Sequence, residues 1–268
     1  TDFATSVDGM PVNMRSHGHG QGYTDLNFII PELVEEIVYR KGSYYSDVGD
    51  FSGAGSARIQ TRDHSVPFTI QLGAGEYGFA RALLSGSTGS GTGELIYGLE
   101  LQGYEGPWDQ LDEDVEKTNF LLKQIWASEE SHYSLSLMGY DNEWNSADQI
   151  PDRAVRSGLI SKYGSIDTTV GGSSSRYSLS FGLSRPLAGG ELNATAYAID
   201  YAMDLYSNFS YFIAPGGDQF KQVDDRRIYG GELTWDRASR NPAVSTTSSA
   251  IRTLKKFFII GTAANSCR

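Results

Sequence analysis

Two histidines one residue apart are the first side chains in this sequence with types and spacing that suggest chemistry. His17 and His19 flank Gly18, and Asp25 follows shortly after. Imidazole and carboxylate groups bind divalent metal ions, and a suitably folded loop could bring both histidines to one ion. No helical or strand spacing fixes their geometry, because the surrounding stretch is rich in glycine. We interpret His17 and His19 as weak metal candidates, and we expect no metal and no cofactor.

An acidic run and a glycine-rich run could each suggest an enzyme. Paired carboxylates can hydrolyse glycosidic bonds, and four lie close together at Asp112, Glu113, Asp114 and Glu116. In a polar loop such groups stay ionised and solvated, which disfavours a catalytic role. The run 86–93 contains no lysine, and this disfavours a phosphate-binding loop. The sequence therefore predicts a protein that is not an enzyme.

Charge and composition limit the remaining classes. The 268 residues carry a net charge of −11, which disfavours nucleic acid as a partner. All 33 acidic residues lie at or before Asp236, so residues 237–268 are basic. The one cysteine, Cys267, allows no disulfide within the chain. We also expect no transmembrane helix, because the sequence contains no long apolar run.

From residue 67 onward, strands are predicted to be joined alternately by short turns and long loops. Short periplasmic turns and long extracellular loops are typical of barrels in bacterial outer membranes. The turns are expected at 87–93, 129–131 and 187–190, and the loops at 105–118, 142–176 and 207–227. Eight strands are expected, at 67–75, 78–86, 94–104, 119–127, 132–141, 177–185, 191–205 and 227–235.

The predicted strands carry one apolar face, as in 94–102, where Leu95, Tyr97, Leu99 and Leu101 face away from Glu94, Gly98, Glu100 and Gln102. Periodicity does not distinguish a face that packs on a core from one that faces lipid. The predicted lengths suit a tilted strand that crosses a membrane, which needs about 9–11 residues. The alternative is a soluble extracellular all-β carbohydrate-binding module, with Trp108, Trp144 and Tyr206 as stacking platforms.

The first 66 residues predict a separate α+β unit. Residues 7–12 read as a strand, a turn and a strand, and Pro31 suits the first position of a short helix within 30–37. A further strand is expected at 37–40, and another at 57–61 after a glycine-rich bend.

Several stretches of this unit resemble the C-terminal half of the plug of TonB-dependent outer-membrane receptors. They are Val7-Asp8-Gly9, Pro11-Val12-Asn13, Ile30-Pro31-Glu32, Tyr39-Arg40-Lys41-Gly42, the run from Gly49 to Gly55, and Thr61. Residues 67–235 resemble the first part of the barrel of the same family. The matching stretches there are Gly106-Pro107-Trp108, Ile150-Pro151, Ser157-Gly158, Asp167 with Gly171-Gly172, Arg176-Tyr177-Ser178, Ser207-Asn208-Phe209 and Gly217-Asp218-Gln219-Phe220.

The resemblance implies a mainly β fold, with a partial α+β plug in 1–66. An incomplete antiparallel transmembrane β-barrel of about eight meander strands follows in 67–236. Such receptors have roughly 22 barrel strands, so we interpret the chain as a fragment that is not competent for transport as it stands. No signal peptide or coupling segment is recognisable. We interpret 237–268 as a tail foreign to the family, disordered or translated out of frame.

The resemblance also implies a function and a location for the parent protein. It is expected to bind a scarce nutrient in the bacterial outer membrane, most often a ferric siderophore, and to import it with energy from a TonB-type protein. The expected partners are outer-membrane lipid, that coupling protein and a small-molecule or metal-chelate ligand. By their positions in the plug loop and the third outer loop, the ligand-binding candidates are Arg15, His17, His19, Gln21, Tyr23, Asp218 and Gln219.

Overall fold

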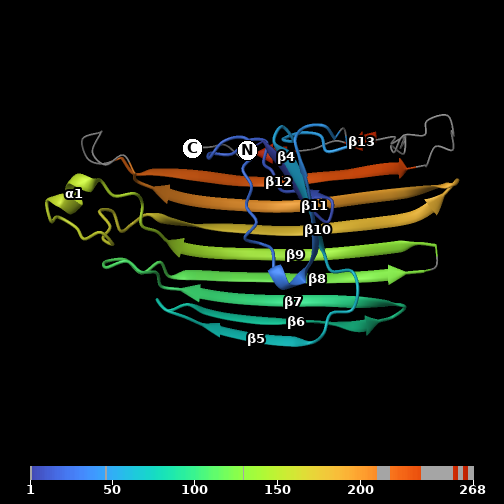
Figure 1. Ribbon diagram of the computed structural model, residues 1–268, viewed down its shortest axis with the longest axis horizontal. Coiled ribbons are helices and arrows are strands. Elements are labelled where there is room, and N and C mark those ends of the chain that lie inside the picture. Colours follow the sequence, from blue (N-terminus) through green and yellow to red (C-terminus); the bar gives the residue numbers. More distant parts are fainter. Residues whose placement is uncertain are drawn as a thin grey trace.

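The computed structural model describes residues 2–45, 47–128, 130–209, 218–236, 256–258 and 262–264. Within these residues the chain forms two sheets, a small one of four strands and a large antiparallel one. Figure 1 shows the small sheet in blue, crossing one face of the large sheet. The small sheet and its loops are called the plug below, and the large sheet is called the wall.

The plug sheet has the strand order β2-β1-β4-β3, with β1 parallel to β4 and the other pairs antiparallel. Asp8 and Gly9 form the tight turn between β1 and β2, and both have positive φ, as a type I′ hairpin turn requires. The helix expected within 30–37 is a single 3₁₀ turn, because the β-branched residues from Val34 onward continue as a strand. The elements are β1 (Phe3–Val7), β2 (Met10–Pro11), η1 (Pro31–Leu33), β3 (Val34–Lys41) and β4 (Gly55–Thr61).

The wall contains the eight expected strands in meander order, and the sheet is not closed into a barrel. They are β5 (Thr69–Ala74), β6 (Ala80–Ser90), β7 (Gly93–Tyr104), β8 (Val115–Ala127), β9 (His132–Asn145), β10 (Gly171–Leu187), β11 (Gly190–Ser207) and β12 (Phe220–Asp236). Two short strands, β13 (Lys256–Phe258) and β14 (Thr262–Ala264), pair with β12. The order and origin of 237–268 as a whole stay a prediction.

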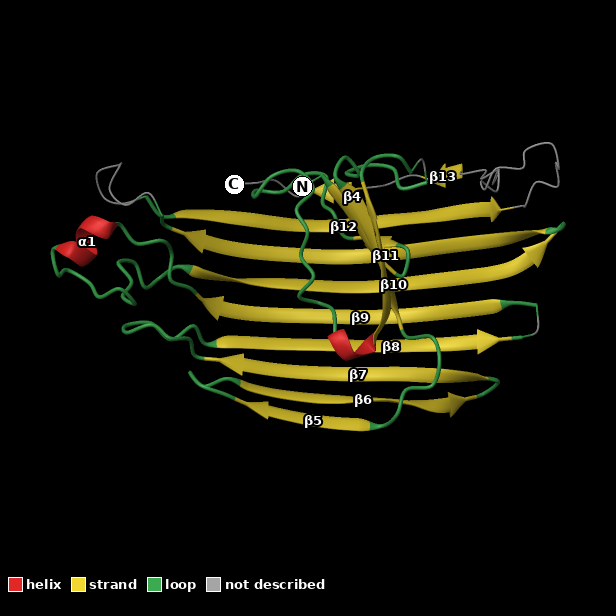
Figure 2. Ribbon diagram, viewed as in Figure 1, coloured by secondary structure: helices red, strands yellow, loops and turns green. Residues whose placement is uncertain are grey.

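The alternation of turns and loops is confirmed, although most strands are longer than expected. Figure 2 shows the short turns at one end of the wall, and the long loops with α1 (Asp152–Arg156) at the other. Strands β10, β11 and β12 have 17, 18 and 17 residues. The extra length lies mainly at the loop end, where β10 begins at Gly171 with a serine-rich stretch. Polar residues there continue the backbone ladder without an apolar pattern.

One face of the wall is apolar and exposed, and we call it the outer face. Toward the loop end charged groups replace the apolar ones: Arg227 pairs with Asp200 at 2.9 Å, and the Tyr177 hydroxyl lies 3.4 Å from Asp141. In the described residues no helix is long and apolar enough to cross a membrane. Exposed apolar side chains on this face are Ile70, Leu72, Leu84, Leu99, Leu101, Leu122, Leu135, Leu137, Tyr177, Leu179, Phe181, Tyr229 and Leu233.

The opposite, inner face of the wall packs on the plug. The shared core contains Val7, Met10, Ile30 and Leu33 from the plug, and Ile96, Leu121, Met138 and Ile199 from the wall. The plug approaches the wall closely at Gly98, where an added Cβ would lie 2.4 Å from Leu33 Cδ1. A larger residue at this position would displace Leu33 where η1 rests on β7.

Candidate ligand-binding site

A cavity of about 290 Å³ lies between the plug and the inner face of the wall. Aromatic, amide and carboxylate groups line it, as is typical of sites for small polar ligands. Its wall residues lie toward the loop ends of their strands, so the cavity is below the long loops. The plug contributes His19, Tyr23, Asp25 and Asn27, β9 contributes Tyr140, Asn142 and Trp144, and β10 and β11 contribute Ser174, Met203 and Leu205.

The plug loop that forms one side of the cavity is held by its own hydrogen bonds. The Asn13 amide donates to Phe3 O at 2.9 Å and to Thr24 Oγ1 at 3.0 Å, and its oxygen accepts from Thr5 N at 2.6 Å. The Asp25 carboxylate accepts from Asn27 N at 2.9 Å. These bonds place Tyr23 and Asp25 at the cavity without help from a ligand.

His17 lies behind this surface, against the wall. Its ring stacks on Tyr23 with centroids 3.9 Å apart, and its side chain has no exposed surface. Its Nε2 lies 3.9 Å from an Asp224 oxygen, and Asp224 forms a buried ion pair with Arg226. In the part of the chain that the structure describes, no three His, Cys, Asp or Glu side chains gather as a metal site.

The surroundings of His17 predict a pH dependence. Burial lowers the pKa of His17 below its usual 6.5, His19 and Arg226 act in the same direction, and Asp224 opposes them. The unfolded state therefore binds the proton more tightly. The stability that buried, neutral His17 contributes is complete above pH 6.5. It is lost as the pH falls through the lower pKa that His17 has in the folded state.

We expect the thermal midpoint of the chain in detergent to fall between pH 7.5 and 5.5, and part of that fall to be absent in His17→Gln. His64, whose side chain is 57% exposed, supplies the control variant His64→Gln, which should retain the part of the fall that His17→Gln removes. An unchanged profile in His17→Gln would contradict the assignment.

The structure brings only some of the sequence candidates to the cavity. His19 and Tyr23 line it, and His17 supports Tyr23 from behind. Arg15 instead pairs with Asp50 at 3.0 Å on the exposed surface of the plug. Gln21, Asp218 and Gln219 are not among the lining residues. A role in ligand binding stays a prediction for all seven candidates that the sequence analysis named.

Gln219 has a role in joining two outer loops. Its amide donates to Asp167 Oδ2 at 3.1 Å and to Thr169 Oγ1 at 2.7 Å, and Asn208 donates to the same carboxylate oxygen at 2.8 Å. Burial alone would raise the pKa of Asp167. Hydrogen bonds from Asn208, Thr169 and Gln219 outweigh burial, so the pKa is lowered. Asp167 therefore links loop 146–170 to both ends of the connection between β11 and β12.

Replacing Asp167 by asparagine should open this junction. Charge-assisted hydrogen bonds contribute about 1.5–3 kcal/mol, so amides in loop 146–170 should exchange with deuterium about tenfold faster or more. Asp152→Asn is the matched control, since Asp152 lies on the same loop in an exposed pair with Arg156. Equal exchange rates in the two variants would contradict a joining role for Asp167.

The alternation of side chains along β9 could have identified its cavity-lining residues from sequence. Leu135 and Leu137 face outward, so Tyr140, Asn142 and Trp144 must face inward. Both Tyr140 and Trp144 line the cavity. Tyr206 lies on the outer face, on the side opposite Trp144. Trp144 and Tyr206 therefore do not form one stacking platform.

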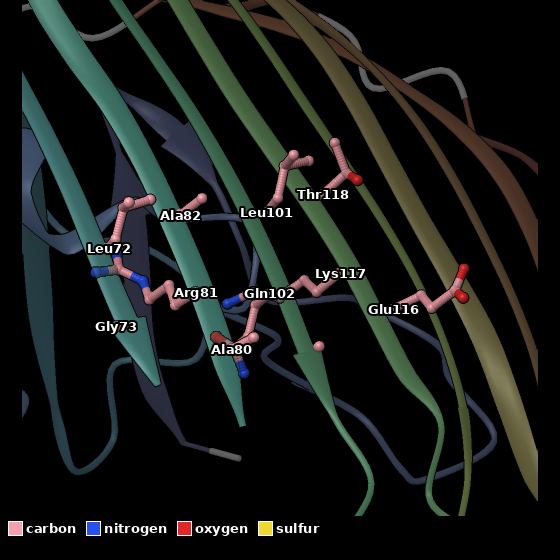
Figure 3. Close-up of a pocket in the computed structure, with 11 residues that line it drawn as sticks. Leu72, Gly73, Ala80, Arg81, Ala82, Leu101, Gln102, Glu116, Lys117 and Thr118 are labelled. Carbon is pink, nitrogen blue, oxygen red and sulfur yellow. The ribbon is translucent and has the colours of Figure 1, made fainter. Parts of the chain in front are cut away.

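A larger hollow of about 440 Å³ lies over strands β5 to β8. Figure 3 shows its residues on these neighbouring strands. Small residues such as Ala80, Ala82 and Gly103 lie there between Leu72 and Leu101 of the outer face. The hollow is an irregularity of the apolar surface rather than a site for a polar ligand.

The two enzyme-like runs have structural roles. Glu113 accepts a hydrogen bond from Trp108 Nε1 at 2.5 Å, and Asp114 accepts one from Asn145 at 3.3 Å, so the acidic run holds its own loop together. The glycine-rich run 86–93 forms the β6–β7 hairpin, and a strand follows it.

A plug sheet that lies against an antiparallel wall, with tight turns at one end and long loops at the other, is the fold of TonB-dependent receptors. Solved structures confirm the resemblance at the level of the fold. The chain is similar to the siderophore receptor PiuA from Acinetobacter baumannii, with 12% identity, a TM-score of 0.70, and coverage of 89% of this chain and 36% of that chain.

Two further solved structures give the same result. The copper transporter OprC has 16% identity and a TM-score of 0.64, over 88% of this chain and 36% of that one. The ferric-catecholate import receptor Fiu of E. coli K12 has 13% identity and a TM-score of 0.65, over 88% and 40%. The chain thus spans about two fifths or less of these proteins. No family model and no curated protein matches the sequence.

Proposed function

We propose that this chain is part of an outer-membrane receptor that binds a scarce nutrient, with a ferric siderophore as the expected cargo. The cavity between plug and wall, below the long loops, is the observation that carries the proposal. It is accompanied by the fold shared with a siderophore receptor and a ferric-catecholate receptor. Import driven by a TonB-type protein belongs to the same proposal and concerns the whole receptor.

The groups around the cavity suit a planar or chelated ligand with polar edges. Tyr23, Tyr140 and Trp144 offer aromatic surface, and Asn27 and Asn142 offer amide groups. The volume of about 290 Å³ is near the lower end for ligand pockets, which span about 300–1,000 Å³. A bulky chelate would therefore fill the cavity with one part and extend toward the loops with the rest.

Tryptophan fluorescence of the full chain in detergent tests this proposal. We expect saturable quenching by at least one ferric chelate from a panel of catecholate, hydroxamate and citrate complexes, and none by the same ligands without iron. Trp144→Phe should remove most of that quenching. Trp235→Phe, at the turn end of β12, should retain it. The absence of saturable quenching by every chelate would contradict the proposal.

A carbohydrate is the second candidate, because the same aromatic and amide groups are typical of sugar sites. The titration decides between the two candidates if oligosaccharides are added in parallel. Saturation by an oligosaccharide, with no response to any ferric chelate, would show that the cavity is a carbohydrate-binding site.

A further inference from the structure

Arg176 is a cation buried between the wall and the plug. It lies on the inner face of β10, 5% exposed. Among the described residues neither Nη1 nor Nη2 has a hydrogen-bond partner, and no carboxylate lies within ion-pair distance. Burying an unpaired charge is costly. Such a group in a folded chain calls for an explanation, such as an ion or ligand that it binds.

The position of Arg176 relates it to the cavity. Along β10 it lies two residues from Ser174, which lines the cavity, on the same face of the strand. Its register neighbours are Tyr140 on β9, which also lines the cavity, and Tyr201 on β11. The Tyr201 hydroxyl is buried and, within the described residues, also has no hydrogen-bond partner. Arg176 and Tyr201 are thus neighbours in register on the inner face of the wall, next to residues that line the cavity.

The cover over this pair belongs to the plug. The guanidinium carbon of Arg176 lies 4.1 Å from the centre of the Phe28 ring, which is 2% exposed. Asp25 acts on the guanidinium through space without forming an ion pair. Asn119 donates to Asn27 O at 2.8 Å and holds the same plug segment to the wall. Displacing this segment would remove the aromatic cover and the compensating negative charge together.

We propose that Arg176 is a second, internal binding site for an anionic oxygen group of the cargo, which the cargo reaches when Phe28 withdraws from the wall. The inference rests on the proposed function. An arginine binds a carboxylate with two parallel hydrogen bonds, and the Tyr201 hydroxyl can donate a third. The incoming anion would take over the charge compensation that Asp25 provides while the plug is in place. The site therefore favours a cargo that carries carboxylate or similar anionic oxygen donors.

Calorimetric titration of the full chain in detergent with citrate tests the site. Phe28→Ala removes the cover, and Phe28→Leu reduces it with less disturbance of the core. We expect at least one of the two to bind citrate tenfold or more tightly than the wild type does. Combining the Phe28 variant with Arg176→Gln should abolish that gain. Combining it with Arg176→Lys instead should keep part of the gain. Arg185→Gln, which removes an exposed arginine of the same strand, should leave the gain intact.

A stability readout distinguishes a binding role from a structural one. Arg176→Met removes an unpaired buried charge, so its thermal midpoint should equal or exceed that of the wild type. A clear fall in the midpoint would show that the guanidinium stabilises the fold and would overturn the inference. Folded Phe28 variants with no gain in citrate binding would also overturn it. If Trp144 still responds to a ferric chelate in that case, the inference fails while the proposed function stands.

Discussion

Replacing Leu179 by arginine is expected to destabilise the chain by about 2–4 kcal/mol in phospholipid vesicles, because a cation would then lie within the hydrocarbon layer. Leu179 is 48% exposed on the outer face of β10, between Ala198 and Leu137 on the neighbouring strands. In water an exposed leucine at such a position can be replaced at almost no cost. The measurement is equilibrium unfolding by urea, followed by tryptophan fluorescence.

Ser173→Arg is the matched control for this substitution. Ser173 lies on the same face of the same strand, beyond Tyr177 toward the loops and next to Asp204 and Glu143 in register. An arginine at the edge of the membrane costs only about 0–1 kcal/mol. Equal and small effects of the two substitutions would show that the outer face meets water, as a soluble carbohydrate-binding module requires.

The alternation of side chains made most of the wall predictable from sequence. In 94–102 the residues expected to share one face do share it, and Leu99 and Leu101 are exposed there, since a period of two assigns every residue once a few leucines are placed. The ends of the strands were harder to predict. Residues 171–176 are mostly serine and glycine, so nothing apolar marks them as a strand, yet backbone pairing with β9 and β11 continues through them.

The site was predictable in part, for a similar reason. His19 and Tyr23 were predicted from their position in a plug-like loop. The alternation of side chains along β9 would have added Tyr140 and Trp144. Met203 and Leu205 meet that loop only because strands β9, β10 and β11 pair in this register and the plug packs against them. The pattern of a single sequence does not contain such long-range contacts. The unpaired state of Arg176 was equally inaccessible, because a sequence shows a charge without its neighbours.

Glu100→Gln is expected to weaken the attachment of the plug to the wall and to cost about 3–5 kcal/mol, as breaking a buried ion pair does. Glu100 is 1% exposed on the inner face of β7. One of its oxygens lies 2.6 Å from Arg81 and the other 2.6 Å from Lys117. Arg81 also binds Glu32 of the plug through both carboxylate oxygens, at 2.7 and 2.8 Å. Bonding to Arg81 lowers the pKa of Glu32, so that carboxylate stays ionised.

The loss at Glu100 would leave Lys117 without its carboxylate partner and Arg81 with Glu32 alone, so the effect should reach the plug through Arg81. Unfolding in urea gives the free energy, and hydrogen exchange of η1 and β3 shows whether the plug loosens first. Glu116→Gln is the control, because Glu116 is an exposed outer-face carboxylate of β8. It should change stability by no more than about 0.5 kcal/mol. The salt dependence of the stability loss distinguishes a buried network from surface charges. A buried network is screened little, so the loss at Glu100 should persist in concentrated NaCl. A loss that disappears in salt would contradict the role of a buried network in joining plug and wall.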